Sequence, residues 1–210
     1  MRNVSGTPLL FAILTGLMLT SCNVVKEASQ SILNLTRCSF KLDGISNFRL
    51  AGVLLYGKTS LDVNDATQAL TEFAQGEFPV SFILNVAVKN PDGGAAATTS
   101  SNTMLTSLAW TLLIDDVPTI EGDIPQPVTI PGSGQQAIVP VWMKFDLLRF
   151  FKDKGFEKLV ALAFELGGAH GSANRVTLRA KPTIKTSLGD FVYPGEIEIV
   201  AKEFRGSEGG

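Results

Sequence analysis

Apolar and polar residues alternate along several short stretches of this chain, and prolines and glycines separate the stretches. The clearest is residues 82–90, where every even-numbered position up to 88 is apolar. The same alternation runs through residues 108–114, and the acidic pair at 115–116 then turns the chain back. About seven such strands, without a regular exchange of strands and helices, predict a mainly β protein, an antiparallel β-sandwich.

Three stretches interrupt this pattern with helical spacing, namely residues 64–74, 146–154 and 156–166. The first is expected to be capped by Asn64 or Asp65, and the second by Asp146. The fold is therefore predicted to carry two or three short helical insertions. Pro140 lies inside an expected strand and predicts an edge or a bulge there, because proline has no N–H to donate. The pair at 43–44, Asp-Gly, indicates a hairpin or a bulge.

Composition excludes several classes of function. The chain has 18 basic and 20 acidic residues, one histidine and two cysteines. Without a basic surface, we expect no binding of nucleic acid through its phosphates. One histidine and two cysteines are too few to form a multi-histidine metal site or a zinc ribbon. No metal ion and no other cofactor is expected.

The first residues are expected to be an export signal rather than part of the fold. Arg2 is followed by an apolar run over residues 8–19, which is too short to span a bilayer. The run ends in Leu19-Thr20-Ser21-Cys22, which resembles a bacterial lipobox. The resemblance implies cleavage between Ser21 and Cys22, a thioether lipid on Cys22, and acylation of the new amino group.

The residue after the lipidated cysteine bears on the destination. Asn23, rather than aspartate, follows Cys22, and by resemblance to the enterobacterial sorting rule this favours the outer membrane. We expect the protein to be lipid-anchored there in the bacterial envelope, facing the periplasm more readily than the cell surface. Two or more acyl chains give stable attachment.

These observations divide the chain into four parts. They are a signal peptide at 1–21, a lipidated N-terminus and tether at 22–37, a β-sandwich at 38–203, and a disordered tail at 204–210. The tether, residues 24–36, would span at most about 45 Å when extended. Cys38 lies beside Phe40 at the start of a strand, and we expect it to be a buried, unreactive thiol.

One region resembles a known family. It comprises residues 80–92 (VSFILNVAVKNPD), 108–118 (LAWTLLIDDVP), 121–122 and 128–135 (VTIPGSGQ). This arrangement resembles the late embryogenesis abundant type 2 domain, also called the water-stress hypersensitive-response domain. The resemblance implies an immunoglobulin-like or fibronectin III-like sandwich linked to stress tolerance, with no catalytic residues to transfer. The long loop at 94–103 and the helical pair at 146–166 depart from the family pattern.

Candidate reactive groups are few. His170 lies in a glycine-rich loop without an orienting partner, so we expect a solvated side chain rather than a general base. Asp115, Asp116 and Asp123 do not follow the spacing of a calcium loop, and turn chemistry accounts for them better.

Aromatic residues are the better candidates for contact with other molecules. Trp110 is in phase with the core positions of its strand, whereas Trp142 is out of phase and is expected to face outward or to lie under the helices. Trp142 together with Phe150 and Phe151 forms the predicted partner-contact patch.

Two hypotheses follow for the function. The first is a non-enzymatic, lipid-anchored binding or stress-protective (desiccation-type) module, held to the membrane by its lipid, with an envelope protein as a candidate partner. The alternative is a structural accessory subunit of an outer-membrane assembly, secretion or export complex. In the alternative, the helical pair and the proline-rich edge at 125–131 would be the docking surfaces.

Overall fold

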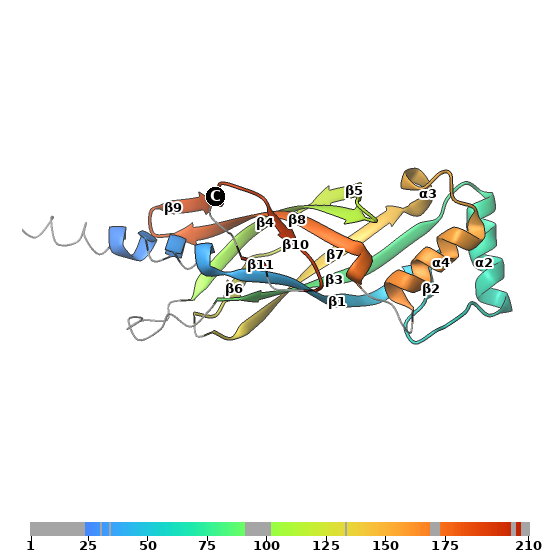
Figure 1. The fold of residues 1–210 in the computed structure, drawn as a ribbon, viewed down its shortest axis with the longest axis horizontal. Helices are drawn as coiled ribbons and strands as arrows, with labels where there is room; N and C mark the ends of the chain where they lie inside the picture. The colour runs from blue at the N-terminus through green and yellow to red at the C-terminus, as the bar shows by residue number, and fades with distance from the viewer. Residues whose placement is uncertain are drawn as a thin grey trace, which may run out of the picture.

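Two antiparallel β-sheets form the body of an elongated molecule (Figure 1). The computed structural model describes residues 24–29, 31–33, 35–90, 102–132, 134–168, 173–202 and 205–206. Apolar side chains from both sheets form one hydrophobic core. The prediction of a mainly β, antiparallel sandwich with short helices is confirmed.

The first sheet has five strands in the order β11-β1-β3-β7, with β2 paired to β1. The predicted alternation gives the residues that face the core. Leu84 of β3, for example, is buried and lies opposite the buried Val141 of β7. The register between β1 and β3 shifts between Leu42 and Gly44, so the Asp-Gly pair makes a bulge and not a hairpin. The strands are β1 (Ser39–Leu50), β2 (Val53–Leu54), β3 (Pro79–Lys89), β7 (Gln136–Asp146) and β11 (Arg205–Gly206).

The second sheet has six strands in the order β10-β8-β4-β5, with β6 paired to β4 and β9 paired to β8. Its long strands β4 and β8 run the length of the sandwich, and Leu108, Trp110, Leu112 and Ile114 of β4 are buried as expected. The strands are β4 (Thr103–Ile114), β5 (Val117–Gly122), β6 (Val128–Ile130), β8 (Val176–Thr186), β9 (Gly189–Val192) and β10 (Ile197–Ile199).

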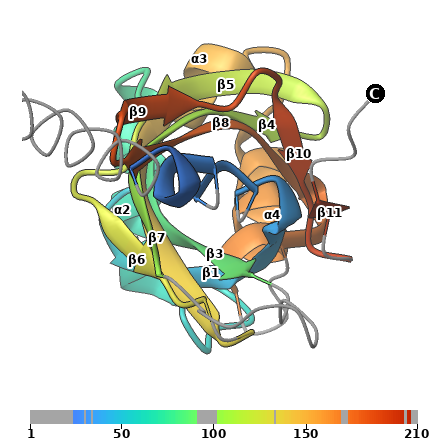
Figure 2. The same cartoon turned by 90° about the vertical axis from the view of Figure 1, so that its left-hand side faces the viewer.

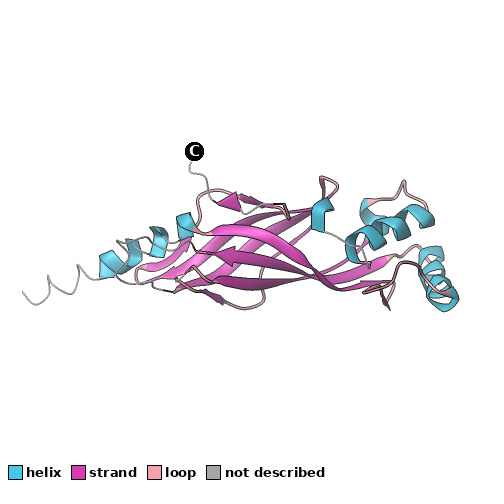
Figure 3. Ribbon diagram, turned by 60° about the horizontal axis from the view of Figure 1, so that its bottom comes forward, coloured by secondary structure: helices cyan, strands magenta, loops and turns pink. Residues whose placement is uncertain are grey.

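Three α-helices and a 3₁₀ turn pack at one end of the sheets (Figure 3). Asp146 caps α3 as predicted, because its Oδ1 accepts a hydrogen bond from the N–H of Leu148 at 2.8 Å. The cap of α2 was predicted wrongly. Asp62, and not Asn64 or Asp65, accepts the N–H of Asp65 at 2.9 Å, and the helix begins one residue earlier. The elements are α2 (Val63–Ala74), α3 (Leu147–Phe150), α4 (Phe156–Gly167) and η2 (Ala173–Arg175).

The segment expected to be a tether between the lipid and the domain forms helical turns. Residues 24–29, 31–33 and 35–37 form helical turns, which we call the N-terminal helical segment. Its Ala28 and Leu35 are buried. Figure 2 shows these turns lying over the end of the sandwich, between the two sheets. A helix rises about 1.5 Å per residue, so the segment reaches less than half as far as an extended chain.

The C-terminal end also differs from the prediction of a disordered tail over residues 204–210. Arg205 and Gly206 form β11, which pairs with Phe40 and Ser39 of β1. The backbone groups at this edge of β1 thus gain hydrogen-bond partners, which explains why a glycine-rich sequence is ordered at this point. Residue 204 and residues 207–210 lie outside the described part of the chain.

Pro140 was expected on an edge strand or at a bulge, and the edge is confirmed. It lies in β7, which ends the strand order of its sheet, opposite Asn85 of β3. Within the described residues, no helix is both long enough and apolar enough to cross a membrane.

Candidate functional site

Trp142 was expected to face outward or to lie under the helices, and the structure shows the outward position. Trp142 lies on β7 opposite Ile83, between the core residues Val141 and Met143, so it points away from the core. Its side chain is 65% exposed. Ile138, four residues earlier on the same face, is also exposed. We call Ile138 and Trp142 the outer apolar pair.

The other two residues of the predicted contact patch lie elsewhere. Phe151 is only 3% exposed and belongs to the core, so its assignment as a contact residue is wrong. Phe150 packs against the ring of Phe145 with the centroids 5.9 Å apart. Phe145 is three residues from Trp142 on β7 and therefore points to the opposite face. The structure does not bring Phe150 and Phe151 together with Trp142 into one patch.

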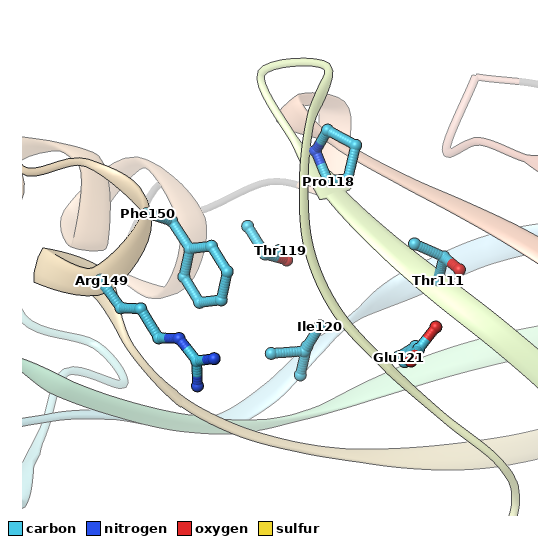
Figure 4. A pocket seen from close by; sticks show the side chains of 7 residues that line it. All are labelled: Thr111, Pro118, Thr119, Ile120, Glu121, Arg149 and Phe150. Carbon is cyan, nitrogen blue, oxygen red and sulfur yellow. The ribbon is translucent and has the colours of Figure 1, made fainter.

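Phe150 instead lines a cleft between β5 and α3 (Figure 4). The cleft has a volume of about 370 Å³. Arg149 and Phe150 of α3 face Ile120 of β5, and the carboxylate of Glu121 lies on the far side. The remaining lining residues are Thr111, Pro118 and Thr119.

The cleft combines a cation, a carboxylate and an apolar wall. The guanidinium of Arg149 lies over the ring of Phe150, 5.7 Å from its centroid. Four of the cleft's seven lining residues are polar or charged, so the cleft is more polar than the typical pocket for a small ligand. A small molecule or peptide that carries one negative and one positive group would be complementary to Arg149 and Glu121.

Local sequence explains why β5 returns along β4 to form this wall. Asp115 and Asp116 adopt left-handed φ angles of 50° and 62°, which the two central residues of a tight hairpin turn require. Further along, Gly122 lies against Trp110, where a Cβ would come within 2.6 Å of the indole Cζ2. The hydroxyl of Thr119 donates to the carbonyl of Leu112 at 2.9 Å, at the point where the register of the two strands shifts.

The acidic residues weighed as a cation site have structural roles. The carboxylate of Asp115 accepts two hydrogen bonds from Arg175, and Glu165 pairs with the same guanidinium. The hydrogen bonds and charge of Asp115 raise the pKa of Arg175. Asp123 accepts the N–H of Leu108 at 2.6 Å. Among the described residues no group of three or more potential metal ligands occurs.

The expected burial of Cys38 is confirmed, since its side chain is enclosed in the core. Burial raises the pKa of Cys38 from its ordinary value of 9.0 to about 12, because the thiolate would lose its hydration. In a Cys22→Ser protein, where Cys38 is the only thiol, we expect labelling by an exposed-thiol reagent only after denaturation. Rapid labelling of the folded chain would contradict this.

The raised pKa of Cys38 also predicts how the stability of the protein changes at alkaline pH. The unfolded chain releases the Cys38 proton near pH 9 and the folded chain near pH 12, so the associated stability is complete below pH 9 and is lost between these values. Urea unfolding of the Cys22→Ser protein and its Cys38→Ala variant across this range measures the difference. The variant is expected to decline less steeply above pH 9.

Several residues singled out in the sequence lie outside the described part of the chain. They are Ser21 and Cys22 of the lipobox and His170 of the glycine-rich loop. The cleft between β5 and α3 was not predicted. Its signal in the sequence was Arg149-Phe150 directly after the capped start of α3, but which strand would face these residues depends on how the two sheets pack.

Comparisons with known proteins show no family for this chain. The chain matches no protein-family profile and no curated protein. A solution structure of a provisionally assigned late embryogenesis abundant (LEA) protein is 15% identical, with 95% of this chain and 92% of that chain covered and a TM-score of 0.36. A protein from Archaeoglobus fulgidus is 15% identical, covering 60% of this chain and 87% of its own, with a TM-score of 0.30. Membership of the type 2 family stays a prediction.

Proposed function

We propose that the protein is a non-enzymatic binding module of the bacterial envelope, anchored to the outer membrane by a lipid on Cys22. The observation that carries the proposal is Leu19-Thr20-Ser21-Cys22 at the end of an apolar run. The cysteine of this lipobox comes two residues before Val24, where the N-terminal helical segment begins. Lipidation at Cys22 would therefore place a folded domain directly at a membrane surface.

Two surfaces of the sandwich support a binding role. The cleft between β5 and α3 offers opposite charges beside an apolar wall, and the outer apolar pair exposes a tryptophan on the other sheet. Exposed tryptophan is enriched where proteins meet their partners. Protection of other envelope molecules during water stress, which the type 2 resemblance implies, is a form of this binding role.

Metabolic labelling with a clickable fatty acid tests the anchor. We expect the wild-type chain to incorporate the label, to begin at Cys22 and to fractionate with the outer membrane. Cys22→Ser is expected to abolish labelling and cleavage. Cys38→Ala is the matched control, because it removes the other cysteine and is expected to retain the label.

An unlabelled wild-type chain, or label retained in Cys22→Ser, would overturn the lipid anchor. Mass spectrometry of the mature N-terminus distinguishes cleavage from lipidation.

The outer apolar pair favours one alternative, a structural subunit of an envelope complex. A photo-crosslinking residue in place of Trp142 tests it, with Leu70 of α2 as the matched exposed control. A single crosslinked envelope protein captured from position 142 and not from position 70 would support the subunit. Equal and diffuse capture from both positions would argue against it.

A further inference from the structure

The N-terminal helical segment is joined directly to the tip of a hairpin at one end of the sandwich. The hydroxyl of Ser187, in the turn between β8 and β9, donates a hydrogen bond to the carbonyl of Val24 at 2.8 Å. These residues are 163 positions apart in the chain. In Figure 1 the first helical turns and the β8–β9 turn lie at the same end, opposite α2 and α4.

The turn itself is held by internal hydrogen bonds. The hydroxyl of Thr186 accepts the N–H of Leu188 at 3.2 Å and donates to the carbonyl of Gly189 at 2.6 Å. Gly189 has a φ of +118°, a conformation that favours glycine. The turn is therefore a defined projection, with the position of Leu188 set by its neighbours.

This projection carries an apolar tip. Leu188 is 65% exposed, and Val25 on the adjoining helical segment is 54% exposed. Tight turns favour glycine, asparagine, aspartate and serine, so a leucine at this position needs a reason beyond the turn. Beside the tip, Lys185 and Asp190 pair at 3.1 Å, which leaves no net charge on this pair.

The chain length between the lipid and the tip is very short. Only Asn23 separates Cys22 from Val24, so the chain between them reaches at most about 7 Å. The bond from Ser187 then ties Val24 to the turn. A lipid on Cys22 that enters a bilayer must bring the β8–β9 turn to the bilayer surface, because no extended tether is left to hold it away.

We propose that this end of the sandwich, which we call the anchor end (Val24, Val25, Ser187 and Leu188), rests on the phospholipid bilayer with Leu188 and Val25 at the headgroup boundary. The proposal rests on the proposed lipid anchor and adds an orientation to it. The long axis of the sandwich then points away from the membrane, and α2 and α4 form the end that faces the periplasm.

A depth measurement in vesicles tests the orientation. The full lipidated protein is purified as Leu188→Cys and, as a matched control, Val63→Cys on the exposed start of α2 at the opposite end. Each is labelled with an environment-sensitive fluorophore and placed in phosphatidylcholine–phosphatidylglycerol vesicles that contain a headgroup nitroxide quencher. Cys38 is buried and is expected not to react.

We expect the probe at 188 to shift to shorter wavelength and to be quenched severalfold more than the probe at 63. Equal quenching at the two positions, on protein shown by mass spectrometry to carry lipid, would overturn the orientation and leave the anchor intact. Protein without lipid on Cys22 would overturn both proposals. A Val25→Cys probe repeats the comparison from the helical segment, in case Leu188→Cys disturbs the turn.

Discussion

Replacing Phe48 by alanine is expected to lower the free energy of unfolding by about 3–5 kcal/mol, a large part of the roughly 5–15 kcal/mol that stabilises a domain. Phe48 is 1% exposed and stacks on Phe82 with ring centroids 5.3 Å apart and planes 11° from parallel. The end of α4 packs against it so closely that a Cβ on Gly167 would come within 2.0 Å of the Phe48 Cγ. The cavity left by alanine would therefore open between a sheet and a helix.

Trp142→Ala is the matched control for this substitution. It removes a larger aromatic side chain from the same sheet, but from the exposed face. We expect a change within about 0.5 kcal/mol. Urea unfolding followed by circular dichroism measures both variants, and similar losses from the two would show that the placement of Phe48 in the core is wrong.

The strands could be predicted because their signal is local. Alternation in β3 and β4 separates buried from exposed positions over many residues, so the core face of each strand follows from the order of its residues. The same reasoning placed Trp110 inward, which the structure confirms, and left two positions open for Trp142, of which the structure shows the outward one. Turn residues predicted where the strands end. Asp115 and Asp116, which both have left-handed φ angles, form the turn between β4 and β5.

The N-terminal helical segment shows where local reasoning fails. Its serines and weak periodicity favour a flexible tether, yet Leu35 is fully buried and belongs to the hydrophobic core that both sheets share. That core exists only after the sandwich has formed, so no window of sequence around residue 35 contains it. β11 was missed for the same reason, because its partner Phe40 lies 165 positions from Arg205.

Phe151 and the cleft illustrate a similar limit for the candidate site. The neighbouring phenylalanines 150 and 151 look equivalent in sequence, but the last turn of α3 directs one into the core and leaves the other partly open beside β5. A helix of four residues offers too little periodicity to tell the two faces apart. Phe150 and Ile120 line the same cleft because α3 and β5, which are distant in the sequence, meet there in the fold.

The N-terminal helical segment also yields the second large effect, since Leu35→Ala is expected to destabilise the protein by about 2–5 kcal/mol. Leu35 is fully buried, and the N–H of Cys38 donates to its carbonyl at 3.1 Å, so the residue joins the segment to the start of β1. Urea unfolding of the Cys22→Ser protein, which keeps the whole segment without the lipid, measures the loss.

Leu33→Ala provides the comparison that decides between a docked segment and a tether. Leu33 has the same side chain in the same helical segment but is 52% exposed, and its loss is expected to change stability by less than about 0.5 kcal/mol. If the segment were an extended tether, both substitutions would leave the unfolding transition where it is, because neither leucine would touch the sandwich. A loss of stability in Leu35→Ala but not in Leu33→Ala shows that the segment is part of the fold. Because Cys22 is only two positions from Val24, it must then lie close to the body of the protein.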